Sequence, residues 1–404
     1  AASDVYKRQE LHQYIEQLFP IKRNNDSFRE DLSQVLKKYL DNIDSIPVET
    51  VTYIPNWSDL KVRIKKLITH IEKSVESYYL GMRNEAYRVL QSDIMGDDGI
   101  INSIGLHTIT KEEETLDGKR STYFFRARFF QDKNDKTYRD MFHIPLNMRG
   151  RVSTQRYSSP GYPCLYLGTS VYACWEELLR PRFDDVMFSG FKVTRTFKLF
   201  DLRIPAKTDF EEDKLSNVLL RLPLIIACSF PVWYPNDQFK PEYIIPQLLT
   251  EIIISNNRKA IEQNYVAIDE LVWGIIYTST HNNESFGFGS DFQQNIALPV
   301  IQADRNDYCH VLASLFALTQ PTCNEYEEVK SMQPYLFGAP PTDFEEKKRY
   351  AYSISKFAFI EGKLRSMPTK ELPYLYVTKP KILIPQNGEG ATCNVVSNQE
   401  WHIE

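Results

Sequence analysis

The stretch over residues 148–179, MRGRVSTQRYSSPGYPCLYLGTSVYACWEELL, constrains the fold more than any other part of the sequence. No helix can run through its SSPG turn, because proline fixes φ and glycine frees it. After the turn, residues 164–167 form an apolar run that is typical of a short buried strand, and residues 170–179 are typical of a helix. Pro181 ends that helix, since the residue before a proline is displaced from the α region.

Charged side chains lie on both sides of this turn. The basic residues Arg149, Arg151 and Arg156 precede or enter it, and the helix that follows carries the adjacent carboxylates Glu176 and Glu177. Guanidinium groups bind phosphate oxygens through paired hydrogen bonds. The combination of a basic entry, a strand and a carboxylate-bearing helix therefore indicates a site for a phosphate-bearing ligand.

The same stretch resembles a known family. R-x-S-x-P-G-x-P-x-L-Y-L-x-x-S followed by A-x-x-E resembles the core of the RES domain, which is named for its Arg, Glu and Ser. Upstream, residues 123–128 (YFFRAR) resemble the family's first strand, which carries the Arg. Downstream, residues 274–279 (GIIYTS) resemble the strand that carries the Ser, so that the resemblance covers roughly residues 121–300.

The resemblance implies both a fold and an activity. RES proteins are similar to ADP-ribosyltransferases in fold and are known as toxins that consume NAD, releasing nicotinamide by phosphorolysis or hydrolysis. An α+β chain is therefore expected, with an ADP-ribosyltransferase-like mixed β-sheet core behind an all-α N-terminal domain. NAD is the expected substrate rather than a cofactor, with inorganic phosphate as a candidate co-substrate and a cognate antitoxin or regulatory protein as a candidate partner. Two alternatives stay open: transfer of ADP-ribose to a protein or nucleic acid, and an inactive RES fold that serves as a binding module.

Three residues match the positions that give the family its name. Cleavage of the nicotinamide–ribose bond passes through an oxocarbenium-like state, as cleavage of a glycosidic bond does. The resemblance implies that Arg126 binds the pyrophosphate, that Glu176 stabilises the developing positive charge, and that Ser279 orients the ribose or the carboxamide. The ordinary structural interpretations are a strand-edge arginine, an i,i+4 ion pair of the glutamate with Arg180, and a hydroxyl that caps a turn.

Other residues near the motifs are alternates or candidate substrate-binding residues. Arg128 shares a strand face with Arg126, since side chains alternate along a strand, and it is the alternate phosphate ligand. Arg156 is a second candidate for phosphate, and Tyr166 and Tyr277 are candidates for stacking on the substrate. The alternative interpretation is that both tyrosines are buried in the hydrophobic core and do not contact the substrate.

The choice between the two adjacent glutamates depends on the helical register. Glu176 keeps the A-x-x-E spacing and shares a partly apolar helix face with Tyr172 and Leu179, which predicts that it faces the site. An ungapped match from Tyr166 selects Glu177 instead, so Glu177 is the alternate catalytic carboxylate.

Changes in composition along the chain indicate four parts. Residues 1–9 resemble a translated adaptor sequence and are treated as a non-native leader. Residues 10–115 form the expected helical N-terminal domain. Residues 95–120, which include a GDDG sequence and the charged run over residues 111–120, have the character of a linker to the next part. The expected catalytic domain spans residues 121–304, and residues 305–404 are an expected C-terminal extension packed on it.

Within the N-terminal part, apolar residues recur at helical spacing over residues 28–40, 60–71 and 75–90 and predict three helices. Arg63 and His70 fit the loose arginine–histidine spacing of ribonucleases resembling HEPN modules. Such spacing arises often by chance, so these helices are expected to modulate or assemble the enzyme without carrying its chemistry.

Composition limits the other possibilities. The net charge of −5 argues against a general nucleic-acid binder, which is usually basic. The six cysteines form no CxxC pair and no Cys/His ligand spacing, so no metal is expected and a reducing compartment is indicated. No apolar run reaches the ~18 residues of a membrane span and the N-terminus lacks a signal-peptide core, which together suggest the cytoplasm.

Overall fold

The structure is a computed structural model. The described residues are 11–12, 14–15, 17–46, 54, 56–95, 99–100, 105–115, 118–206, 209, 212–262, 270–280, 293–301, 308–322 and 344–372. The expected leader at residues 1–9 lies outside these ranges. Within them, no helix combines the length and the apolar character that crossing a bilayer requires.

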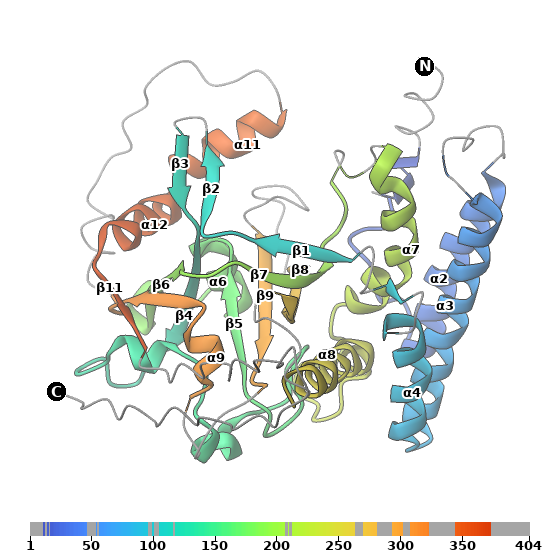
Figure 1. The fold of residues 1–404 in the computed structure, drawn as a ribbon, viewed down its shortest axis with the longest axis horizontal. Coiled ribbons are helices and arrows are strands. Elements are labelled where there is room, and N and C mark those ends of the chain that lie inside the picture. The colour runs from blue at the N-terminus through green and yellow to red at the C-terminus, as the bar shows by residue number, and fades with distance from the viewer. Residues whose placement is uncertain are drawn as a thin grey trace, which may run out of the picture.

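A mixed sheet forms the centre of the molecule (Figure 1). In the described ranges it has nine strands in the order β1-β7-β8-β9-β5-β4-β6-β10-β11, and β7 and β8 are its parallel pair. The strands are β1 (Leu106–Ile109), β4 (Tyr123–Phe129), β5 (Cys164–Gly168), β6 (Val186–Val193), β7 (Phe197–Leu202), β8 (Val272–Thr278), β9 (Gln294–Pro299), β10 (Phe316–Thr319) and β11 (Thr369–Glu371). The expected α+β fold with a helical N-terminal region is confirmed.

The inner strands β8 and β9 are buried along their whole length, and the sequence of β8 is accordingly almost entirely apolar. Gly274 of β8 lies against the backbone of β9 at Ala297. A Cβ atom at this position would meet the carbonyl oxygen of Ala297 at 2.1 Å, so only glycine fits there without moving the backbone. The glycine of the GIIYTS motif therefore sets the close approach of the two strands.

Helices cover one side of the sheet in two layers. The first layer is α7 (Glu212–Cys228) and α8 (Ile244–Glu262), which contact β7 and β8. The second is α2 (Phe28–Ser45), α3 (Trp57–Tyr79) and α4 (Arg83–Met95), which lie at the outer side of α7 and α8 in Figure 1. The two layers share one hydrophobic core. The N-terminal helices are therefore packed on the region that carries the motifs.

The sheet reaches beyond the limits expected for the catalytic domain. The segment over residues 95–120, interpreted as a linker, contributes β1, which pairs with β7. It also contains the hairpin of β2 (Glu112–Thr115) and β3 (Gly118–Ser121), in which Arg120 Nε lies 2.7 Å from Glu113 Oε1. The charged run thus forms an exposed strand pair whose opposite charges face each other. At the other edge, β10 and β11 come from the C-terminal part of the chain.

The remaining described elements are eight helices. The short helices are η2 (Tyr138–Met141), η3 (Leu146–Arg151), η4 (Phe183–Asp185), η6 (Pro241–Tyr243) and α9 (His310–Ala313), and the remaining helices are α6 (Val171–Glu177), α11 (Phe344–Ser353) and α12 (Lys356–Ser366). The helix expected after the SSPG turn is α6. It begins after Ser170, whose hydroxyl accepts a hydrogen bond from Ala173 N at 2.9 Å.

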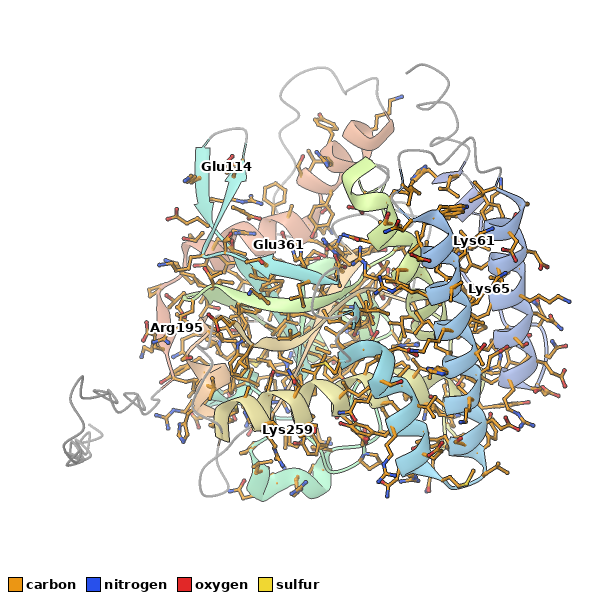
Figure 2. All side chains as sticks on the ribbon, turned by 45° about the vertical axis from the view of Figure 1, so that its right-hand side comes forward. Lys61, Lys65, Glu114, Arg195, Lys259 and Glu361 are labelled. Atoms are coloured by element: carbon orange, nitrogen blue, oxygen red, sulfur yellow. The ribbon has the colours of Figure 1, made fainter. Side chains whose placement is uncertain are left out.

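The lysines of α3 belong to a solvated helix face. Lys61 and Lys65 lie on the outer side of the helical layer in Figure 2, and both pair with Asp44 of α2, at 3.6 and 2.9 Å. The candidate ribonuclease residue His70 contacts Asp93 of α4 through Nδ1 at 2.5 Å.

A buried ion-pair cluster joins the N-terminal segment to the region that carries the motifs. The Arg23 side chain is 2% exposed, and its Nε donates to Asp31 Oδ2 at 2.7 Å. Its Nη1 also donates to the carboxylate of Glu242 in η6, a residue 219 positions away. Both carboxylate side chains are 1% exposed, so the arginine compensates two charges that water cannot reach.

We expect Arg23→Ala to lower the free energy of unfolding by about 3–5 kcal/mol, because removing one partner of a buried ion pair leaves its charges uncompensated. Urea denaturation would measure the loss. Lys37→Ala, at an exposed position of α2, is the control and should unfold near the parent midpoint. Equal midpoints for Arg23→Ala and the parent would show that the cluster does not stabilise the fold.

Candidate functional site

The motifs converge on one pocket of about 430 Å³ at the centre of the sheet. Its walls come from β4, the segment over residues 151–156, β5, α6, η6, β8 and β9. The polar side chains that line it include Arg126, Arg128, Arg151, Arg156, Tyr166, Glu177, Tyr277 and Asn295. Residues from all three motif segments, 123–128, 148–179 and 274–279, therefore line one cavity.

One wall of the pocket is cationic. Arg126 Nη1 donates to the carbonyl oxygens of Met141 and Phe142 at 3.1 and 2.9 Å, and Arg128 Nη1 donates to the carbonyl of Asp140. Burial, and to a lesser extent the neighbouring Arg128, lower the pKa of Arg126 to about 9. Among the described residues neither guanidinium forms a salt bridge with a carboxylate. The chain at residues 140–142 thus orients two cations without neutralising them, as an anion-binding wall requires.

The lining of the same pocket also includes a carboxylate, which is held by the end of β8 and by β9. Glu177 Oε1 accepts hydrogen bonds from Ser279 Oγ and from Asn295 Nδ2, both at 2.7 Å. Ser279 and Asn295 are each 3% exposed. Ser279 does not itself line the pocket, but it fixes the carboxylate that does. Glu177 also raises the pKa of Tyr277, after the larger effect of burial. The arginine wall and the negatively charged wall therefore share one cavity.

The two adjacent glutamates have different surroundings. Glu176 is 5% exposed, and its Oε2 accepts a hydrogen bond from Arg180 Nε at 3.0 Å, which is the i,i+4 pair of the ordinary structural interpretation. The face that Glu176 shares with Tyr172 is apolar as expected, but it packs against α12: the Tyr172 and Phe357 rings lie 5.1 Å apart. The sequence favours Glu176, whereas the geometry favours Glu177, because an apolar helix face can be buried against another helix as well as against a site.

Arg156 lines the pocket but is engaged elsewhere. Its Nη1 donates to the carbonyl oxygens of Cys228 and Phe230, both at 3.0 Å, and its Nη2 donates to Thr280 Oγ1 at 3.0 Å. Its guanidinium carbon lies 5.3 Å from the centre of the Tyr243 ring. These contacts fix the end of α7, so that the structure gives Arg156 an architectural role beside the pocket.

The two candidate tyrosines, Tyr166 and Tyr277, line the pocket, and Tyr157 contacts both of them. Tyr166 OH accepts a hydrogen bond from Tyr157 N at 3.2 Å, and the Tyr157 and Tyr277 rings lie 4.6 Å apart at 47°. Tyr166 and Tyr277 both line the cavity. Tyr277 is 6% exposed and belongs to the hydrophobic core, and it also lines the pocket. The two interpretations of this residue are therefore compatible.

One pocket residue was not selected from the sequence. Asn295 is the second residue of the buried strand β9, and a polar residue there is a weak signal until its neighbour Glu177 on α6 is known. Arg151 was named only as part of the basic segment, and its exposed side chain also lines the pocket. Among the described residues no group of His, Cys, Asp or Glu side chains could hold a metal ion.

This arrangement defines the class of the domain. Residues 125–307 match the family model of the RES domain, and this segment of the chain belongs to that family, as the three motifs predicted. The chain is similar to the protein named "Putative toxin YopC" of Bacillus subtilis (strain 168), with 30% identity over 313 residues. The match covers 72% of this chain and 66% of that relative, so it extends well beyond the RES segment. No solved structure is a significant match for the chain.

Proposed function

We propose that this protein cleaves the nicotinamide–ribose bond of NAD, as a phosphorylase or a glycohydrolase, and that it acts as a toxin or defence effector. The observation that carries the proposal is the carboxylate of Glu177, held by Ser279 and Asn295 in the pocket that Arg126 and Arg128 also line. The RES family match and the similarity to a protein named as a toxin support the same conclusion.

Each wall has a task in this reaction. The bond from ribose C1′ to the pyridinium nitrogen breaks, and its electron pair leaves with nicotinamide, which departs neutral. Positive charge then develops on the ribose ring, and the Glu177 carboxylate stabilises it. Arg126 and Arg128 bind the pyrophosphate of the substrate. An oxygen of phosphate or of water forms the new bond to C1′. When water is the acceptor, it releases a proton to the solvent, and when hydrogen phosphate is the acceptor, its anionic oxygen attacks directly. The same site could pass ADP-ribose to a macromolecule, and the choice of acceptor is decided by product analysis.

We expect the purified protein to release nicotinamide from NAD. We also expect this to happen without added metal, since no step of the cleavage needs one. Incubation with NAD, with and without inorganic phosphate, followed by identification of the products, would measure it. A phosphorylated ADP-ribose product indicates phosphorolysis, and free ADP-ribose indicates hydrolysis. Intact NAD after prolonged incubation, or loss of turnover with EDTA, would contradict the proposal.

Glu177→Gln should lower kcat by about 100-fold or more, because it removes the charge that stabilises the transition state while it preserves the side-chain shape. Glu176→Gln is the matched control one residue away, and it should stay within a few-fold of the parent. Steady-state kinetics on both variants, with thermal unfolding to confirm the fold, would test this. The reverse order of effects would return the catalytic role to Glu176.

Arg126→Lys should lower kcat/KM by about 10- to 100-fold although the charge is kept, since hydrogen bonds to charged groups contribute about 1.5–3 kcal/mol. Among the described residues, Arg126 donates to protein only through Nη1, to two carbonyl oxygens. Its other nitrogens are then available for the substrate, and a lysine cannot do both. Arg182→Lys, at an exposed position, is the control. If Arg126→Lys matches the parent, Arg128 or Arg151 is the pyrophosphate ligand.

A further inference from the structure

The C-terminal part of the chain packs directly on the helix that carries Glu177. The ring of Phe357 on α12 lies 5.1 Å from Tyr172 and 5.3 Å from Trp175 of α6. Ile360 and Leu364 on the same helix are 3% and 0% exposed and join a cluster with Phe125 of β4 and its neighbours. This helix lies outside the segment that matches the RES family, residues 125–307. A part of the chain beyond the RES segment therefore contacts the back of the candidate site.

A buried carboxylate of α12 reaches the first turn of α6. Glu361 Oε1 accepts a hydrogen bond from Val171 N at 2.8 Å, and it also accepts one from the Tyr352 hydroxyl of α11. Ser170 satisfies another early amide of the helix, Ala173 N. The amide of Val171, the first residue of α6, is thus held by a residue 190 positions away in the chain. Figure 2 labels Glu361 on this C-terminal helix, close to the sheet.

We propose that Glu361 is a positioning residue for Glu177, and that residues 344–372 complete the site by fixing the start of α6. The proposal rests on the proposed function. Glu361 does not line the pocket and touches no reacting atom; it acts through the helix.

The shortness of α6 makes its anchoring important. The helix has 7 residues, and helices much shorter than ~12 residues are marginal unless tertiary contacts hold them. Its other end offers no continuation, because Leu179 and Arg180 have φ values of 60° and 58° and turn the chain sharply away. Glu177 is the last residue of the helix, so a rotation or shift at the start moves its carboxylate away from Ser279.

The charge of Glu361 suits this role. A carboxylate at a helix N-terminus interacts favourably with the free amides and the helix dipole. Burial raises the pKa of Glu361, and the hydrogen bonds from Tyr352 and Val171 offset only part of that rise. Burying a carboxylate has a free-energy cost unless its oxygens accept hydrogen bonds. The two donors to Glu361 are Val171 N of α6 and the Tyr352 hydroxyl of α11, so the same bonds that offset this cost also join α12 to both helices.

The test compares Glu361→Ala and Glu361→Gln with Glu371→Gln, the same chemical change at an exposed position of the same segment. Glu361→Ala should lower kcat for NAD by about 10- to 100-fold, the size expected for a misplacement of about 1 Å, while KM stays near the parent because the arginines of β4 are untouched. Glu361→Gln should lose less, since its amide oxygen can still accept from Val171 N. Glu371→Gln should match the parent.

Amide hydrogen exchange on the full chain gives a second readout that does not depend on turnover. The peptide containing α6 should exchange faster in Glu361→Ala, and a peptide from α8 should not change. Unaltered α6 exchange would show that Glu361 does not hold the start of α6. Faster α6 exchange with parental kcat would show that Glu361 holds the helix but does not position Glu177 for the reaction. If the parent protein leaves NAD intact, the proposed function fails by itself, and the exchange measurement still decides whether Glu361 holds α6.

Discussion

The contact of Glu177 with Ser279 and Asn295 is the interaction on which the rest of the site depends. A helix end and two neighbouring strands meet at this carboxylate, and both hydrogen bonds are 2.7 Å long. For the three elements to meet, β8 and β9 must lie close together, which Gly274 permits, and α6 must begin and end at the right residues. The arginines of β4 line the same cavity, and β4 is separated from β9 by β5 alone in the sheet order.

Much of this site could be predicted from the sequence, because its parts are local patterns. The SSPG turn, the strand after it and the helix that follows each have their own signal in consecutive residues, and YFFRAR and GIIYTS each form one strand. The register of α6 could not be predicted. The choice between Glu176 and Glu177 depends on what covers the helix face that carries Tyr172, and the covering helix, α12, comes almost 200 residues later in the chain. Arg156 was ambiguous for a similar reason, since its carbonyl partners lie at the end of α7.

The fold shows the same division between local and distant information. The apolar spacing over residues 28–90 predicted the helices correctly, but it divided α3 too early: the real break falls after Tyr79, at Gly81 with its φ of 78°. The segment over residues 95–120 was interpreted as a linker from its GDDG sequence and charged run. Its strands have four residues each, which is too few for an alternating pattern to stand out. β1 is stabilised by pairing with β7, a partner about 90 residues away that no local pattern reveals.

The same short strands affect how the molecule meets its neighbours. In the part of the chain that the structure describes, the large sheet ends in β1, with four residues, and β11, with three. The outer strand β11 reads Thr-Lys-Glu and is mostly exposed. An open sheet edge is a template for pairing with another chain, and short or charged edge strands weaken that template. The segments added on either side of the RES region therefore also shield its long, apolar inner strands from edge-to-edge aggregation.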